Sequence, residues 1–454
     1  MKLINDFTEG NILSPLIKFT ILIFLSLFLQ VMYGTVDLAI VGQFGTAADL
    51  SAVSTGSQIM NIITVIIAGF TMGTTILLGQ QTGKGKSDDL GKIIGASIAL
   101  FGMIAIIITV VMLLFARSIT ELMQVPPEAF EKAVSYIVIC SSGTVFIVAY
   151  NVISGILRGL GNSKLPLIFV AIACVVNIAG DFFFVAVLHL NTSGVAISTI
   201  IAQATSVVLS VQIIKKQGVP FPFKRNFIKF QKGFTTEMLK LGTPIAFQNG
   251  LNSISFSIIY AIVNTLGLTA SAGIGVAEKI FSFLVMSSTA FMSSISTFTA
   301  QNVGARKYDR SEKCLTYGLL FSSIIGFTLF YISFWWGDVL ASVFTQEKDV
   351  ITAAAGFLKA TAIECFLVSI ATCYLGYFNG IGKTLFVMIQ SLFTAFLIRI
   401  PVLFYMSQIP NVTMFQLGLA APISAMGSLI ACFVYYYRLK KKTSPNISLH
   451  SIEG

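Results

Sequence analysis

The segment GFTMGTTILLGQQTGKGKSDDLGK (69–92) has a counterpart later in the chain, AFMSSISTFTAQNVGARKYDRSEK (290–313). The two segments are separated by 221 residues, and the same separation aligns GILRGLGNSK (155–164) with GYFNGIGKTL (376–385) without a gap. The identical residues in the first pair are Phe70, Gln80, Gly83, Lys86, Asp88 and Lys92, repeated as Phe291, Gln301, Gly304, Lys307, Asp309 and Lys313. Because one separation relates two distant segments, the sequence indicates one unit written twice.

The composition is that of a membrane protein. Of 454 residues, 55% are hydrophobic and 11% are charged, and the mean hydropathy is +0.87. Soluble domains carry roughly 25% charged residues. The useful unit of analysis is therefore the apolar stretch of about twenty residues that crosses a bilayer.

Twelve such stretches are visible, six in each copy of the repeat. Because each half has an even number of spans, it ends on the side of the membrane where it began. The halves therefore insert in parallel and are related by a pseudo-two-fold axis along the membrane normal. Such internal repeats are typical of secondary transporters. We predict an all-α membrane protein with two six-helix lobes. The predicted spans are 16–40, 51–78, 93–115, 133–157, 165–188, 193–214, 240–265, 272–300, 315–335, 351–378, 385–406 and 415–437.

The distribution of basic residues predicts the orientation. Lys and Arg gather after every second span and in the stretch QGVPFPFKRNFIKFQKGF (217–234), and they are sparse in the intervening loops. This is the positive-inside pattern, so both termini and the basic stretch are expected in the cytoplasm. The net charge of +10 is thus explained by membrane topology and does not indicate binding to a nucleic acid. The first fifteen residues are polar and predict no cleavable signal peptide.

These boundaries give four predicted regions. They are an N-terminal lobe (1–217), a basic cytoplasmic linker (218–239), a C-terminal lobe (240–437) and a cytoplasmic tail (438–454). The localisation that follows is a multi-pass protein of the plasma (cytoplasmic) membrane.

Several classes of function lack their motifs. The sequence has no Walker A loop and no H-E-x-x-H motif, and only two histidines, His189 and His450. The six cysteines lie mostly inside spans without the spacing of a disulfide or zinc site. We therefore predict neither an enzyme nor an ATP-driven pump, and no bound cofactor. The sequence shows neither a selectivity filter nor a soluble ligand-binding domain, so it does not favour a channel or a receptor.

Four acidic residues lie within the predicted spans: Asp37, Asp181, Glu278 and Glu364. An aspartate at the centre of a membrane helix costs about 2.5–3.5 kcal/mol and is by default functional. Asp37 shares a helical face with Tyr33 and Gln30, and Asp181 shares one with Asn177. Both aspartates are expected at similar depth in the same lobe, about two-thirds of the way across.

The converging carboxylate and amide oxygens suit an ion whose binding changes the charge of the site. Hard cations take oxygen ligands, and a desolvated carboxylate also holds a proton. Loading such a site shifts an equilibrium between two lobe arrangements. We predict a cation-coupling site at Tyr33, Asp37, Asn177 and Asp181, with Asp37, Asn177 and Asp181 as the metal ligands if the ion is sodium.

The second half contains a different polar set. Pro244 is followed by amides that suit a substrate cavity, although helix–helix packing explains them about as well. Glu278 precedes Lys279, and Glu364 either lines a substrate path or pairs with Arg399. The predicted substrate-cavity residues are Gln30, Gln248, Asn249, Asn252, Glu278 and Glu364.

Several motifs together resemble the multidrug and toxin extrusion (MATE) family. They are FLQVMYGTVDLAIVGQFG, LRGLGNSKLPL, VNIAGDFFF, LGTPIAFQNGL, VAEKIFSF and TAQNVGARKYDRSEK, and they are spread over nearly the whole chain. The resemblance implies twelve helices in two lobes that form a V, and export of amphipathic, often cationic compounds against inward sodium or proton flow.

The resemblance is greatest to the DinF-like branch. There, an Asp in the first helix and an Asn-x-x-x-Asp pair in the fifth form a cation site, which corresponds to Asp37, Asn177 and Asp181 here. One departure from the family is the absence of a proline early in the first helix: when KFTILIF (18–24) is aligned with KLGTPIAF (240–247) on their first lysines, Leu22 stands opposite Pro244. A proline bend early in the first helix is therefore not expected.

The expected partners are amphipathic or cationic drugs, sodium ions or protons, and the lipid bilayer, with the chain acting as a monomer. The alternative is a lipid-linked oligosaccharide flippase of the same superfamily, whose pyrophosphate cargo favours basic residues in the cavity. The charges within the spans are here mainly acidic, Lys279 and Arg399 excepted, which favours a cationic cargo.

Overall fold

Long helices dominate the computed structural model, which describes residues 3–447, and this described part contains no β-strand. Many helices exceed the spans predicted from hydropathy. Helix α2 (Ala47–Gly83) and helix α9 (Leu268–Gly304), for example, have 37 residues each. At 1.5 Å per residue such a helix is about 55 Å long, whereas the hydrocarbon core is about 30 Å thick. The helices therefore extend beyond the membrane core.

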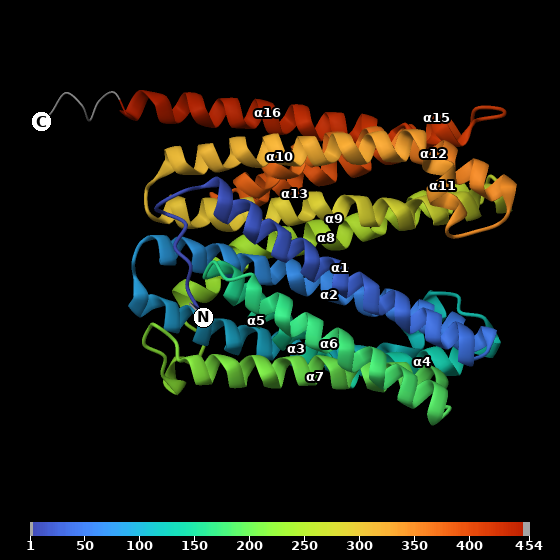
Figure 1. Cartoon of the computed structure of the whole chain (residues 1–454), viewed down its shortest axis with the longest axis horizontal. Helices are drawn as coiled ribbons and strands as arrows, with labels where there is room; N and C mark the ends of the chain where they lie inside the picture. Colours follow the sequence, from blue (N-terminus) through green and yellow to red (C-terminus); the bar gives the residue numbers. More distant parts are fainter. Residues whose placement is uncertain (1–2, 448–454) are drawn as a thin grey trace, which may run out of the picture. The chain divides into compact units, whose positions relative to one another are not determined.

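The order of the elements follows the repeat (Figure 1). The first half forms α1 (Leu13–Phe44), α2, α3 (Ser87–Leu122), α4 (Pro127–Ser142), α5 (Thr144–Gly159), α6 (Lys164–Asp181), the π-helix η1 (Phe182–Val187) and α7 (Asn191–Gln217). The linker contains the 3₁₀-helix η2 (Arg225–Phe227). The second half forms α8 (Lys232–Asn264), α9, α10 (Tyr308–Trp335), α11 (Gly337–Ser342), α12 (Lys348–Gly380), α13 (Thr384–Leu392), the π-helix η3 (Phe393–Arg399), α14 (Ile400–Ser407), α15 (Met414–Gly418) and α16 (Ala420–Ile447).

The number of apolar spans differs from the predicted twelve. Ten helices of the described chain are long and apolar enough to cross a membrane, and the bent pair α4–α5 makes an eleventh. The predicted span 240–265 lies in α8, which is long enough but is diluted by the polar residues Gln248, Asn249 and Asn252. The same side chains that predict a polar cavity thus weaken the hydropathy signal.

The predicted span 133–157 is bent in the structure. Helices α4 and α5 meet at Gly143 with a bend of 51°. A Cβ atom on Gly143 would overlap the side chain of Ile200 in α7. The glycine therefore allows α7 to approach the bend, which hydropathy alone does not reveal.

The chain divides into two compact units that cut across the repeat. One contains Met1–Gly250 with Ala300–Tyr308, and the other contains Leu251–Thr299 with Asp309–Gly454. The first half of α8 belongs to the first unit because it packs closely on α2, where a Cβ atom on Gly73 would overlap the carbonyl oxygen of Met238. The four regions taken from the sequence stay a prediction, and residues 448–454 of the predicted tail lie outside the described residues.

The ends of α2 and α9 form a reciprocal contact within the first unit. A Cβ atom on Gly83 would overlap the carbonyl oxygen of Gln301, and one on Gly304 would overlap the carbonyl oxygen of Gln80. These four residues are two pairs of repeat equivalents. The close crossing explains why a glycine recurs at this position in the two copies of the motif.

The N-terminal strap, residues 3–12, crosses this contact. Asn5 donates from its backbone to Leu160 (3.0 Å) and from its side chain to Gly161 (2.8 Å). Gln301 Oε1 accepts from the backbone of Phe7 at 3.0 Å. The strap thereby ties the α5–α6 turn to the end of α9, and both lie in the first unit.

The second repeated motif forms the same turn in both halves. Gly161 after α5 has φ +81°, and its equivalent Gly382 after α12 has φ +80°. Only glycine adopts this left-handed conformation without cost. The repeat predicted from sequence is thus confirmed in the backbone geometry of the two turns.

Candidate functional site

The predicted coupling residues come from helices that pack against one another in the first unit. Helix α6 packs on both α1 and α7. Tyr33 and Asp37 lie on α1, and Asn177 and Asp181 lie on α6. Asp181 is the last α-helical residue before η1, and π-helical segments are frequent at functional sites.

A glycine beside Asp181 brings α7 close to the site. The Cβ atom that Gly180 lacks would lie 2.8 Å from the Cβ atom of Ser198. Ser198 Oγ donates a hydrogen bond to Asp181 Oδ1 and accepts one from Asn177 Nδ2 at 3.2 Å. The close approach of α6 and α7 therefore builds one side of the site.

The side chain of Asp37 reaches this hydrogen-bonded group from α1. Its carboxyl lies close to both Asp181 and Asn177. Tyr33, one turn away on α1, accepts from Gln203 Nε2 at 3.5 Å and lies close to Asp37. The structure thus brings together all four residues that the sequence predicts, and we call Tyr33, Asp37, Asn177, Asp181, Ser198 and Gln203 the carboxylate-pair cluster.

The cluster is buried and has unused acceptors. Exposed fractions are 6% for Asp37, 1% for Asn177 and 0% for Asp181. Four buried oxygens have no hydrogen-bond partner in the described chain: Asp37 Oδ1, Asn177 Oδ1, Asp181 Oδ2 and Gln203 Oε1. Buried polar atoms are normally satisfied, so these acceptors are available to a cation or a proton.

The charge of the cluster is not balanced by the protein. No ion pair in the described chain involves Asp37 or Asp181. The described residues also contain no group of three His, Cys, Asp or Glu side chains placed to hold a metal ion. Two carboxylates with neutral amide and hydroxyl oxygens fit a monovalent hard cation or protons better than they fit a transition metal.

Two members of the cluster were not predicted. Ser198 and Gln203 lie on α7, and Gly180 explains why that helix is near enough to contribute. The one sequence signal was Gln203, an amide inside the apolar span 193–214. Gln30, predicted for the substrate cavity, lies two turns before Asp37, is half-buried and takes no part in the hydrogen bonds of the cluster.

The polar residues of α8 have mixed surroundings. Asn249 Nδ2 donates to the carbonyl oxygen of Val65 at 3.1 Å, so this amide joins α8 to α2 within the first unit. Gln248 and Asn252 are half-buried. Their assignment to a substrate cavity stays a prediction.

The second unit contains its own group of charges, of which Glu364 is buried and Glu278 and Arg399 are half-buried. Arg399 at the end of η3 pairs with Glu364 of α12, with 3.5 Å between Nη1 and Oε1. The guanidinium also lies 5.0 Å from the ring centre of Phe256 on α8. Glu278 on α9 is near both charged groups. We call Glu278, Glu364 and Arg399 the ionic triad.

The triad is balanced only in part. It carries two carboxylates and one guanidinium, and Glu278 Oε1 and Glu364 Oε2 are buried without a hydrogen-bond partner in the described chain. Pairing with Arg399 was one of the two roles considered for Glu364, and the structure places the two side chains accordingly. The role of Glu278 and Glu364 in a substrate cavity stays a prediction.

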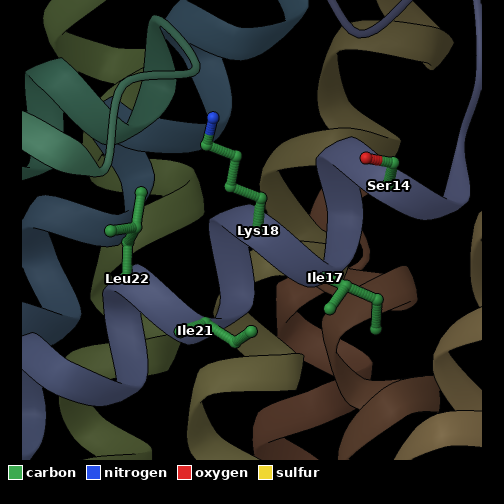
Figure 2. A pocket seen from close by; sticks show the side chains of 5 residues that line it. All are labelled: Ser14, Ile17, Lys18, Ile21 and Leu22. Atoms are coloured by element: carbon green, nitrogen blue, oxygen red, sulfur yellow. The ribbon is translucent and has the colours of Figure 1, made fainter.

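A surface hollow of about 310 Å³ lies elsewhere, along the first turns of α1 (Figure 2). Its lining residues are Ser14, Ile17, Lys18, Ile21 and Leu22. Lys18 and Leu22 point to one side of α1, and Ile17 and Ile21 point to another (Figure 2). The hollow contains no acidic side chain and does not coincide with the carboxylate-pair cluster.

Comparison with known families now identifies the chain. The family model described as MatE matches residues 23–183 and 244–405, more than half of the sequence. The chain belongs to the MatE family. The two matches fall on the two halves of this MatE protein, so each half is one copy of the family domain. With its many apolar helices, it is a multi-pass membrane protein.

Two curated relatives extend over nearly the whole MatE chain. The probable multidrug resistance protein YoeA of Bacillus subtilis is 25% identical over 434 residues, covering 93% of both chains. The probable multidrug resistance protein YpnP of the same organism is 27% identical over 434 residues and covers 95% of this chain and 96% of its own.

A solved structure confirms the predicted fold class. It is described as the outward-facing conformation of a multidrug resistance MATE family transporter of the MOP superfamily. It covers 96% of this MatE chain and 97% of its own, with a TM-score of 0.90 and 19% sequence identity. At that identity the likeness shows the fold alone.

Proposed function

We propose that this MatE protein is a secondary active exporter that exchanges amphipathic, cationic organic compounds for sodium ions or protons. The observation that carries the proposal is the carboxylate-pair cluster, with two buried carboxylates, no basic partner and four unused oxygen acceptors in the described chain. Full-length relatives named as multidrug resistance proteins support the cargo class.

The cluster suggests how an ion acts on the fold. Asp37 belongs to α1 and Asp181 to α6, and two negative charges in such close reach repel each other in a low dielectric. A bound cation or proton removes this repulsion and holds the two helices together. An ion that binds one arrangement of the helices better than another shifts the equilibrium toward it.

The remaining parts of the proposal follow from the family and the charge pattern. The protein acts as a monomer in the plasma membrane with both termini in the cytoplasm, as the positive-inside distribution suggests. It carries out no enzymatic step. Whether the ion is sodium or a proton is the first thing that the experiment decides.

The test uses inside-out vesicles that contain the protein and a fluorescent cationic dye outside. A sodium gradient and a proton gradient are imposed separately for the wild type, Asp37→Asn and Asp181→Asn. We expect one gradient to drive dye uptake in the wild type, and uptake in both variants to fall to the level without a gradient. Asp88→Asn is the matched control, because Asp88 is an exposed carboxylate in the first turn of α3.

Two results contradict the proposal in different ways. Full gradient-driven uptake by Asp181→Asn rejects the carboxylate-pair cluster as the coupling site. Wild-type vesicles that accumulate no dye under either gradient reject multidrug export, and transfer of a lipid-linked oligosaccharide across the same vesicles is then measured to test the flippase alternative.

A further inference from the structure

The basic linker is not a loose connection, because its backbone is fitted onto α3. A Cβ atom on Gly91 would overlap the carbonyl oxygen of Pro222, and one on Gly95 would overlap the carbonyl oxygen of Phe227. Gln231 Nε2 also donates to the carbonyl oxygen of Lys92 at 3.4 Å. The two glycines, one turn apart, form a shallow seat that receives the linker.

The other side of the linker is exposed and basic. Six cationic side chains are exposed on the linker and the adjoining last turn of α7, and no acidic residue occurs between 215 and 232. None of the six forms an ion pair with an acidic side chain of the described chain. They are Lys215, Lys216, Lys224, Arg225, Lys229 and Lys232.

Apolar side chains are interleaved with these charges. Phe223, Ile228 and Phe230 are 38%, 44% and 54% exposed, and they alternate with the basic residues along the linker. Exposed phenylalanines are unfavourable in water but favourable at the boundary between lipid headgroups and acyl chains. The linker directly follows α7, a helix long and apolar enough to cross a membrane, so these apolar and basic side chains lie close in sequence to the end of a span.

We propose that the exposed face of the linker, residues 223–232, binds anionic phospholipid headgroups of the leaflet that it borders. The cationic side chains match the phosphate-bearing headgroups in charge, and the phenylalanines enter the boundary region beside them. The seat on α3 holds the backbone in place, so binding does not require ordering of a free chain. A nucleic acid or a soluble acidic protein matches the charges but leaves the apolar side chains in water.

The experiment measures lipid binding to the purified, delipidated full-length protein by native mass spectrometry. Phosphatidylglycerol, phosphatidylcholine and inorganic phosphate are titrated separately. We expect phosphatidylglycerol to bind more tightly than phosphatidylcholine, and inorganic phosphate not to compete. In K224Q/R225Q/K229Q/K232Q, binding of phosphatidylglycerol is expected to fall by at least about tenfold, since each cation near an anionic surface contributes roughly fivefold.

Control variants separate the site from net charge. K84Q/K86Q/K313Q/K383Q removes four exposed lysines elsewhere, three in turns between helices and Lys313 near the start of α10, and is expected to keep phosphatidylglycerol binding. K224R/K229R/K232R keeps the charge and is expected to bind like the wild type, and the thermal melting temperatures of all variants report folding. I228Q/F230Q tests the apolar part and is expected to reduce binding to a smaller extent.

The proposal is overturned by equal binding of the two lipids, by an equal loss in the linker variant and in K84Q/K86Q/K313Q/K383Q, or by unchanged binding in the linker variant. Competition by inorganic phosphate at the same affinity also rejects a lipid surface. Because no gradient or drug is present, a failure here leaves the proposed transport function untouched.

Discussion

The two units place buried carboxylates in membrane helices but compensate their charge differently. In the first unit, Asp37 and Asp181 lie together with no basic partner in the described chain. In the second, Arg399 pairs with Glu364 and lies near Glu278. Both groups adjoin a π-helix, η1 or η3. The first group therefore has no counter-charge from the described chain, whereas the second contains much of its own.

The strongest test of this difference between the two groups is to neutralise one carboxylate in each. We expect Asp181→Asn to abolish the effect of the coupling ion on drug affinity, an effect typically of about 5- to 150-fold. Glu364→Gln is expected to keep that effect, because the proposed coupling site is the carboxylate-pair cluster and Glu364 already has Arg399 as its counter-charge. Binding of a fluorescent cationic dye to purified protein, with and without sodium and at two pH values, checks both.

The opposite pattern, with ion dependence lost in Glu364→Gln and kept in Asp181→Asn, moves the coupling site to the second unit. Asp88→Asn again controls for the loss of one carboxylate, since Asp88 is exposed.

The second prediction concerns the counter-charge. Arg399→Met leaves Glu364 buried without its cation, and breaking such a pair typically costs about 3–5 kcal/mol of unfolding free energy. The double variant E364M/R399M removes both charges and is expected to recover most of that loss. Thermal melting of the purified protein measures both. A double variant as unstable as Arg399→Met argues that packing around Phe256, and not charge, is what Arg399 supplies.

The third prediction compares the repeat-equivalent glycines of the crossing. Gly83→Ala and Gly304→Ala each place a methyl group against a backbone carbonyl. We expect both to destabilise the protein by about 1–3 kcal/mol, the usual cost of overpacking, and to do so equally because the contacts are equivalent. Gly102→Ala in α3, where a Cβ atom meets nothing within 4 Å, is expected to stabilise slightly. Unequal losses at the two glycines show that the halves do not share this contact evenly.

The smallest effect is expected at the repeated turn. Gly161→Ala and Gly382→Ala each force a side chain into a left-handed conformation, at about 1–2 kcal/mol. Gly161→Ala also meets the carbonyl oxygen of Asn5 in the N-terminal strap, so it is expected to be the more harmful of the two. Equal melting temperatures for the two variants indicate that the strap moves aside without cost.

Helical periodicity predicted four of the six residues of the carboxylate-pair cluster, because those four form two pairs that are each local to one helix. Asn177 and Asp181 are four residues apart on one helix, and Tyr33 and Asp37 are likewise, so their pairing follows from helical geometry. Ser198 and Gln203 join through the approach of α7, which depends on a missing side chain at Gly180. A single glycine beside an aspartate does not change the hydrophobic periodicity of the helix, so the close packing of α7 against α6 was not predicted.

The sequence predicted the outline of the fold but not its irregular segments. The repeat and the spans followed from spacing and hydropathy, whereas the bend at Gly143 and the two π-helices depend on neighbouring helices. The linker was recognised from its charge, but its seat at Gly91 and Gly95 was not. In each case the sequence shows only a glycine or an apolar run, and a tertiary contact decides its conformation.

The reciprocal contact of α2 and α9 has a consequence for the origin of the fold. Each half supplies a glycine and the carbonyl oxygen that faces the glycine of the other half, as Gly83 and Gln80 do in the first. The contact is therefore self-complementary, like the isologous interface of a symmetric homodimer. A chain with one six-helix half already possesses both partners of it. Gene duplication then converts an intermolecular interface into an intramolecular one, and the linker is the covalent tether that makes the assembly independent of concentration.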